Sequence, residues 1–196
     1  KGIEYVKNHP KERANDLLAA ICDEEVDMIL CAIGGDDTYR LLPYLFKNNE
    51  LKEAIEKAEK RKIFLGFSDT TMNHLMLHKL GLGTFYGQSF LADVCEMEDD
   101  MLPYTKKFFE ELIKTGNIKE IVPSDVWYEE RTDWSESAVG TERTKHENEG
   151  FQLLQGKPVF AGKILEAVLK VCMIYLITAD IQIPFLYAKN TIFSLV

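Results

Sequence analysis

The chain has 196 residues, 46% of them hydrophobic, which is enough to bury a core and corresponds to one domain and part of another. Its formal charge of −9, from 32 acidic and 23 basic side chains, excludes the positive surface on which non-specific nucleic-acid binding depends. The four cysteines form no CxxC pair and stand mostly among apolar residues, which predicts free thiols and a cytoplasmic protein.

The chain begins at Lys1 in a polar stretch of helical character, without an initiator Met or a signal peptide, so we expect a longer natural amino terminus with an additional strand. A helix is predicted from Pro10, with apolar residues at helical spacing behind it. Residues 26–33 form an apolar run typical of a strand buried on both faces, and Gly34-Gly35 closes it.

The same unit of strand, turn and helix then occurs a second time. A capped helix is predicted to start at residues 36–38, and a charged amphipathic helix covers 48–60. A buried strand at 63–66 runs into the turn around Ser68 and a helix through Lys79.

The alternation of helices and short strands predicts an α/β fold: a parallel sheet flanked by helices, like a Rossmann or flavodoxin domain. A third strand is expected at 84–87 and a further amphipathic helix at 100–114. Ligands of such sheets bind beyond the carboxyl ends of the strands, where Gly34-Gly35 and Ser68 are expected.

The remaining sequence suggests three further segments after an α/β domain at 1–120. Residues 121–150 are polar and aromatic, as in a linker or long excursion, and 151–164 contain short strands and turns that open a second, β-containing domain. Residues 165–196 contain four charged residues and no glycine, which marks a break in composition. Charges interrupt their apolar run, so they do not form a convincing membrane anchor.

Ser68 stands at a strand-to-helix turn, where a nucleophile can be exposed beside the backbone N–H of Asp69 and the helix dipole. The alternative is that Ser68 or Asp69 simply caps the following helix. The second glycine of a G-x-S-x-G elbow is absent, which argues against a general α/β-hydrolase.

Gly34-Gly35 could supply a second oxyanion donor, because glycine lets backbone N–H groups approach a ligand, or could simply form a tight turn. No G-x-G-x-x-G or P-loop motif is present, which favours chemistry without a cofactor. His74 and His78 share a helix face but lack the acidic residue of an H-E-x-x-H zinc site, so we expect no metal. Neither these two nor His146 is well placed as a base for Ser68.

Trp127, Tyr128 and Trp134 form an aromatic group that could stack on a substrate or pack between domains.

Five segments occur in an order and spacing that closely resembles peptidase family S66, the LD-carboxypeptidase and microcin-immunity family, across residues 10–164. They are AIGGDDTYRLLPYL, KIFLGFSDTTMNHL, GLGTFYGQSF, VWYEERTDW and GFQLLQGKPVFAGKIL. The resemblance implies that Ser68 is the nucleophile and that the N–H groups of Asp69 and the Gly34-Gly35 turn form the oxyanion hole. It also implies a microcin-like branch in which Trp134 contacts the nucleotide part of the substrate.

The resemblance further implies a Ser-Glu-His triad whose Glu and His come from the carboxy-terminal domain, and this chain contains no match for either. The family continues after GKIL with a Gly-Ser-Cys-Leu-Glu-Ser type of run. A nucleotide sequence for such a run, read one base later, encodes Glu166–Met173. We therefore hypothesise a frameshift near Leu165, with a non-native tail and an inactive fragment.

The full-length enzyme is thus expected to cleave an amide bond in a murein LD-peptide or a peptidyl or aminoacyl nucleotide, without metal or cofactor and as a homodimer. No nucleic-acid or membrane partner is expected. Two alternatives remain: an α/β domain that binds a small anionic ligand at Gly34-Gly35 and Ser68 without catalysis, and a flavodoxin-like interaction domain that does not depend on Ser68.

Overall fold

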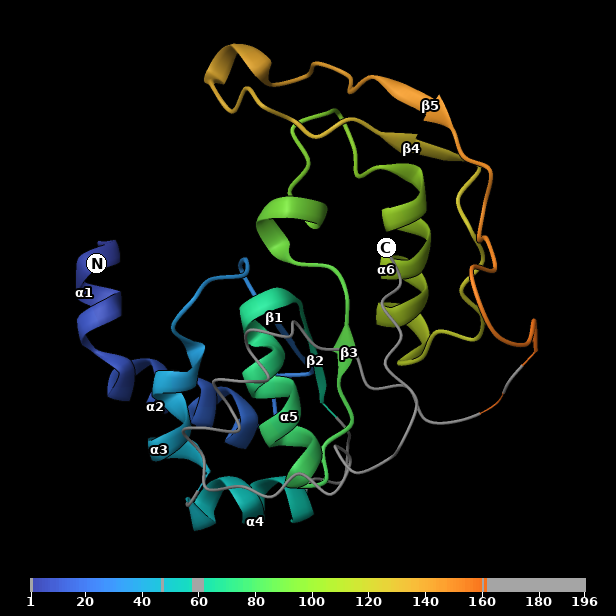
Figure 1. Cartoon of the computed structure of the whole chain (residues 1–196). Coiled ribbons are helices and arrows are strands. Elements are labelled where there is room, and N and C mark those ends of the chain that lie inside the picture. The colour runs from blue at the N-terminus through green and yellow to red at the C-terminus, as the bar shows by residue number, and fades with distance from the viewer. Residues whose placement is uncertain (1, 47, 58–61, 160, 162–196) are drawn as a thin grey trace. The chain divides into compact units, whose positions relative to one another are not determined.

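The computed structural model describes residues 2–46, 48–57, 62–159 and 161, which form two compact units that divide between Ser89 and Phe90 (Figure 1). This division comes earlier in the chain than the domain boundary predicted at residue 120. The prediction assigned helix α6 (Pro103–Thr115) to the first domain, whereas α6 belongs to the second unit. The domain limits of the whole protein stay a prediction.

The first unit contains five α-helices in its described part, and they alternate with strands as the sequence pattern predicts. Pro10 stands in the first turn of α2, where its missing N–H costs no helical hydrogen bond. Two short 3₁₀ turns, at Thr38–Leu41 and Ser68–Thr70, precede α3 and α5. The helices are α1 (Ile3–Asn8), α2 (Pro10–Cys22), α3 (Leu42–Leu45), α4 (Asn49–Lys57) and α5 (Thr71–Lys79).

Three parallel strands form the sheet of this unit in the order β1-β2-β3, so the predicted α/β class is confirmed. They are β1 (Met28–Leu30), β2 (Ile63–Gly66) and β3 (Phe85–Tyr86). The strand predicted at 26–33 is shorter, and it is half-buried rather than buried on both faces. The reason is its place at one end of the described strand order, whereas β2 lies between two strands and is buried along most of its length.

The apolar core of the first unit surrounds α5, which is buried from Thr71 to Leu77. Met76 and Leu77 are fully buried, and side chains of α3, α4 and β2 pack against them in one cluster. Burying a large apolar side chain stabilises the fold by about 1.5–3 kcal/mol. The turn at Ser68 therefore stands directly before the most deeply buried helix of the unit.

The second unit contains one long helix and a short antiparallel hairpin. After a π-helical turn (Phe90–Val94) come α6 and the strands β4 (Val126–Tyr128) and β5 (Lys145–Glu147), with a 3₁₀ turn between the strands at Glu136–Ala138. The segment 121–150, predicted as a linker or excursion, thus holds the hairpin of this unit.

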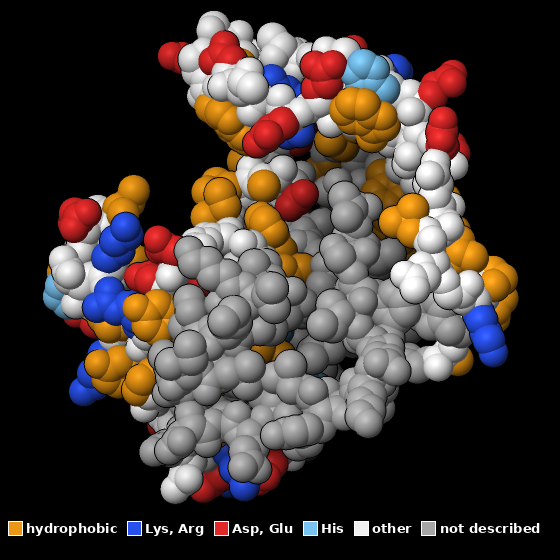
Figure 2. All heavy atoms as spheres, viewed as in Figure 1, with side chains coloured by type: hydrophobic (Ala, Val, Ile, Leu, Met, Phe, Trp, Pro, Cys, Tyr) orange, Lys and Arg blue, Asp and Glu red, His pale blue; other side chains and the backbone are white. Residues whose placement is uncertain are grey.

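The strands predicted in 151–164 are absent from the part of that segment that the structure describes, residues 151–159 and 161. Its apolar side chains are exposed, so no buried face is available on which a sheet could form. Figure 2 shows that exposed apolar side chains are interspersed with charged ones over both units in that view. The exposed apolar residues of the segment are Phe151, Leu153, Leu154 and Val159.

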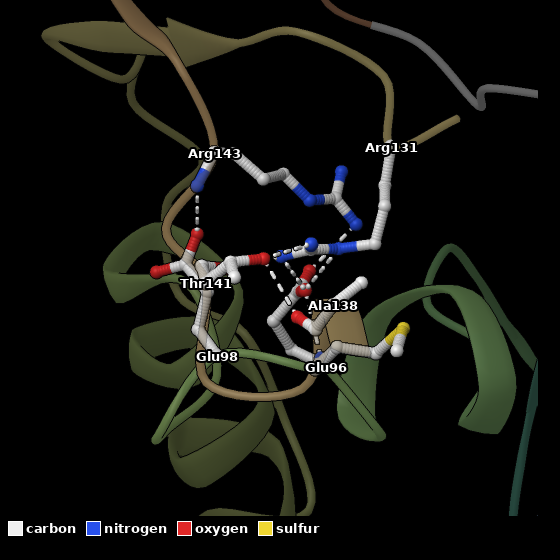
Figure 3. A network of polar contacts seen from close by, with 7 residues as sticks. Glu96, Glu98, Arg131, Ala138, Thr141 and Arg143 are labelled. Atoms are coloured by element: carbon white, nitrogen blue, oxygen red, sulfur yellow. Dashed lines mark hydrogen bonds and ion pairs between the residues drawn. The ribbon is translucent and has the colours of Figure 1, made fainter. Parts of the chain in front are cut away.

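A buried ion cluster ties together distant parts of the second unit (Figure 3). The Glu96 carboxylate, 1% exposed, lies 3.2 Å from the guanidinium of Arg131 and 2.6 Å from that of Arg143. Arg131 also donates to the carbonyl and hydroxyl oxygens of Thr141, at 2.7 and 2.9 Å, and the Arg143 N–H donates to Glu98. The cluster thus connects the loop before α6 with both ends of the hairpin's connecting loop.

Within the described ranges, no helix is long and apolar enough to cross a membrane. The predicted frameshifted tail at 165–196 lies outside the described residues, so that hypothesis stays a prediction. The cytoplasmic location also stays a prediction.

Candidate active site

The carboxyl ends of the three parallel strands bring together the residues singled out in the first unit. Gly34 and Gly35 follow β1, Ser68 follows β2, and Tyr86 is the last residue of β3. The register pairs Gly66 with Tyr86, so the end of β3 lies beside the residue two positions before Ser68. This is the sheet edge at which ligands of α/β folds bind.

Ser68 stands in a backbone conformation that L-amino acids rarely adopt. Its φ is +57°, and it is the non-glycine residue with positive φ among those the structure describes. Phe67 before it is extended. Two hydroxyl groups of the next turn hold the backbone in place: Thr70 donates to the Phe67 carbonyl at 2.8 Å, and Thr71 donates to the Ser68 carbonyl. Such strain is typical of residues held for a function.

The capping alternative for this turn is wrong. Neither the 3₁₀ turn nor α5 has a side-chain cap, and no described side chain hydrogen-bonds the Ser68 hydroxyl. The Asp69 carboxylate instead accepts the backbone N–H groups of Asp37, at 3.1 Å, and Thr38, at 2.8 Å. Asp69 therefore caps the turn after Gly34-Gly35 and ties that loop to the nucleophile turn.

The same loop is also held from the side of α2. Both carboxylate oxygens of Asp37 accept hydrogen bonds from Arg13, at 2.9 and 3.0 Å. Both bonds come from the Nη1 atom of Arg13, and each is a charge-assisted hydrogen bond. The Gly34-Gly35 loop is thus held at its carboxyl side by a side chain from α2 and by a buried carboxylate beside Ser68.

Gly34 is a glycine because it lies against Ser68. A Cβ atom at position 34 would be 2.9 Å from the Ser68 Cβ, 3.1 Å from its Oγ and 4.0 Å from the Asp69 backbone nitrogen. At Gly35, a Cβ would lie 3.2 Å from Oδ2 of Asp69. Side chains on this loop would occupy the space next to the hydroxyl, so the glycines leave the backbone itself beside Ser68.

Tyr86 contacts the Ser68 turn directly, and the sequence reading did not identify it. Its hydroxyl oxygen accepts the Ser68 backbone N–H at 2.8 Å. That N–H is therefore occupied, so the next backbone N–H of the turn that could face a substrate is that of Asp69. One feature of the sequence indicates this role: Tyr86 stands at the end of the strand predicted at 84–87, directly before Gly87.

The side chain of His74 connects the end of β2 to the segment before β3. Its Nε2 donates to the Gly66 carbonyl at 3.2 Å, so Nδ1 is left to accept the Thr84 hydroxyl at 2.8 Å. Burial lowers the pKa of His74 to about 4, and the hydrogen bond to Gly66 opposes this in part. The ring is thus neutral with both nitrogens engaged, which agrees with the expectation that it is no base for Ser68. His78 is exposed on the following turn.

Gly66 allows the close packing behind the nucleophile. A Cβ there would lie 2.7 Å from the Cys31 sulfur and 2.8 Å from the Thr70 hydroxyl oxygen. Burial raises the pKa of Cys31 to about 11, although the Thr70 hydroxyl lowers it in part, so the thiol is protonated near neutral pH. Cys31 is therefore a packing residue.

Trp134, predicted to contact substrate, lies in the loop that follows β4 and is 57% exposed. It belongs to the second unit, whereas Ser68 belongs to the first. Trp127 stacks on His146, with ring centroids 4.4 Å apart, and His146 bonds Glu129 at 2.8 Å. Within the described part of the chain, no group of three or more acidic, cysteine or histidine side chains could hold a metal ion.

The chain is similar to a family of carboxypeptidases. Residues 1–87 match the LD-carboxypeptidase N-terminal domain of peptidase family S66. The probable murein peptide carboxypeptidase of Bacillus subtilis is 33% identical over 111 residues, which are 56% of this chain and 32% of that protein. The microcin C7 self-immunity protein MccF of Escherichia coli is 27% identical over 66% of this chain and 36% of that protein.

Two solved structures of similar proteins contain AMP or an adenosine derivative. The crystal structure of an MccF-like protein from Streptococcus pneumoniae in complex with AMP is 65% identical, with a TM-score of 0.75 over 80% of this chain and 44% of that one. A structure of the microcin C7 self immunity protein MccF in complex with aspartyl sulfamoyl adenosine is 27% identical, with a TM-score of 0.54 over 71% and 40% of the two chains. The chain spans about a third of the length of the curated relatives named above.

Proposed function

The chain belongs to peptidase family S66, and from that premise we propose that it is the nucleophile-bearing part of a serine carboxypeptidase. The observation that carries the proposal is Ser68. It combines a positive φ, a hydroxyl without a described partner and a glycine loop packed against it. A serine that merely caps a helix needs none of these features.

In the proposed reaction, the Ser68 Oγ attacks the carbonyl carbon of an amide bond next to a terminal carboxylate. The hydroxyl proton passes to a base, the carbonyl oxygen becomes an oxyanion, and the C–N bond breaks as the amine leaves with a proton. Water then hydrolyses the ester to free Ser68. Backbone N–H groups of Asp69 and of the Gly34-Gly35 loop are the proposed oxyanion donors, because Tyr86 occupies the N–H of Ser68.

The base in this proposal comes from outside the described residues. His74 has both ring nitrogens engaged, and no described side chain hydrogen-bonds the Ser68 hydroxyl. Loss of a triad member can lower kcat by about 10⁶-fold, with about 10³–10⁴-fold over water left from binding and the oxyanion hole. We therefore expect hydrolysis from the full-length protein and very little from the 196-residue chain.

For the substrate we favour a peptidyl or aminoacyl nucleotide over a murein peptide. Support comes from the 65% identical protein, whose structure contains AMP, and from the sulfamoyl adenosine complex of the immunity protein. Trp134 is the residue proposed to contact the nucleotide, since its exposed indole is available for stacking.

The test is hydrolysis by the full-length protein, assayed side by side on an LD-tetrapeptide and an aminoacyl sulfamoyl-adenosine. We expect Ser68→Ala to lower kcat by about 10⁴-fold or more while nucleotide binding persists. Ser137→Ala, which removes an exposed serine hydroxyl in the second unit, is the matched control and should leave kcat unchanged. Hydrolysis that survives Ser68→Ala would contradict the proposal, and ligand binding without hydrolysis by the wild type would contradict it and favour the alternative of a non-catalytic binding domain.

A further inference from the structure

We propose that Tyr86 is a positioning residue for the nucleophile: its hydroxyl holds the strained Ser68 turn by accepting the Ser68 N–H. The inference rests on the proposed function of Ser68 as a nucleophile. The carrying observation is the 2.8 Å hydrogen bond from the Ser68 nitrogen to the Tyr86 oxygen, which joins the ends of two neighbouring strands. Among the described residues, Ser68 is also the non-glycine residue with a positive φ, so the bond acts on the strained position itself.

The phenol ring is itself held in place. Tyr86 pairs with Gly66 in the sheet, and the N–H of Gly87 donates to the Gly66 carbonyl at 2.9 Å. The ring of His74 packs against the Tyr86 ring, with centroids 5.4 Å apart, and His74 is bonded on both sides. A rigid acceptor costs little entropy when it orders its donor, so Tyr86 can restrain the turn effectively.

The bond also decides which amides face a substrate. A non-glycine residue at positive φ tends to relax toward negative φ, and that rotation turns its peptide groups and displaces its side chain. With the N–H of Ser68 fixed to Tyr86, the Ser68 Oγ stays beside Gly34, and the next N–H along the turn is that of Asp69. Removing the phenol oxygen should therefore misplace the nucleophile rather than weaken substrate binding. A misplacement of about 1 Å can cost about 100-fold in rate.

The experiment compares Tyr86→Phe with the wild type and with Tyr39→Phe in the full-length protein. The control removes a hydroxyl from another half-buried tyrosine that packs on the same core. We expect Tyr86→Phe to lower kcat by about 10- to 100-fold with KM changed less than about twofold, and Tyr39→Phe to change neither.

A second measurement does not depend on catalysis, and its first part uses the wild-type protein alone. Amide hydrogen exchange of the wild-type protein should show the Ser68 N–H protected, and Tyr86→Phe should accelerate its exchange. Fast exchange of that N–H in the wild type, or a wild-type kcat in a folded Tyr86→Phe, would overturn the inference. If Ser68→Ala retains hydrolysis, the proposed function fails, while the exchange result still decides whether Tyr86 holds the turn.

Discussion

Each of the two units has a different kind of interior. In the first, Met76 and Leu77 of α5 are fully buried among apolar side chains from three other elements. In the second, the buried centre includes the carboxylate of Glu96 between the guanidinium groups of Arg131 and Arg143. In the first unit a strained serine precedes a helix buried among apolar side chains. The second unit buries apolar side chains such as Leu112 as well, but it also buries paired charges.

This difference shows which parts of a fold follow from local pattern. The alternation of short apolar strands with turns and helices predicts a helix at the position of α5. Glu96 and Arg131 lie 35 residues apart, and nothing in the sequence near either one indicates the other. Burial alone would raise the pKa of Glu96, but the Met97 N–H and the two arginines outweigh it, so its pKa lies below the ordinary value.

Of the changes that test this difference between the two units, we expect Glu96→Gln to have the largest effect on stability. The change keeps the shape but leaves two guanidinium groups without their carboxylate, and breaking a buried pair in this way destabilises a protein by about 3–5 kcal/mol. Urea unfolding monitored by hydrogen exchange of peptides from 90–159 should show the loss in the second unit, with residues 71–79 much less affected. Glu110→Gln, which breaks an exposed pair with Lys114 on α6, is the control and should have a far smaller effect. Equal stability of Glu96→Gln and the wild type would mean that the cluster does not hold this unit together.

The next effect in size concerns acid. The pKa of His74 falls from an ordinary 6.5 to about 4 in the folded protein, so between these values the unfolded chain binds a proton that the folded one does not. Stability of the first unit should therefore decrease as the pH falls from 6.5 to 4, by up to about 3 kcal/mol. Glu96 affects stability at a lower pH, because its pKa in the folded protein lies below 4.5. Its contribution to the stability of the second unit is present above pH 4.5 and is lost as the pH falls through the lowered pKa.

Urea midpoints measured for each unit between pH 7 and pH 4 test this order of events. The first unit should weaken before the second, and His74→Gln, which cannot titrate, should flatten the pH dependence of the first unit in that range. A first unit with the same midpoint at pH 7 and pH 4.5 would contradict the prediction and would mean that His74 is charged in the folded state.

The smallest expected change in stability, with a clear change in activity, comes from Gly34→Ala. The added methyl group would lie 2.9 Å from the Ser68 Cβ and 3.1 Å from its Oγ, so the loop or the serine must shift. We expect kcat of the full-length protein to fall by about 10- to 100-fold with little change in the urea midpoint. Gly87→Ala is the matched control, because its Cβ would meet a Leu65 methyl at an ordinary 3.9 Å. An active Gly34→Ala would remove the loop from the proposed oxyanion hole.

The sequence predicted the parts of the fold and site that depend on neighbouring residues. The parallel sheet, the helix that begins at Pro10 and the turn at Ser68 all follow from apolar runs closed by glycines and small polar residues. The hairpin β4–β5 was missed, because its strands are short and half-exposed and lack an apolar alternation. The strands expected after residue 150 were wrong in the described part, because their apolar residues found no surface to pack against.

At the site, the sequence by itself determined that Ser68, Asp69 and Gly34-Gly35 would stand at strand ends on one edge of the sheet, because the carboxyl ends of parallel strands share an edge. Tertiary structure alone decided that Ser68 is strained rather than capping, that the Asp69 carboxylate holds the glycine loop and that Tyr86 takes the Ser68 N–H. These facts depend on which side chain reaches an unpaired backbone group across a strand or loop. That choice is made by packing in three dimensions, and the order of residues along the chain does not record it.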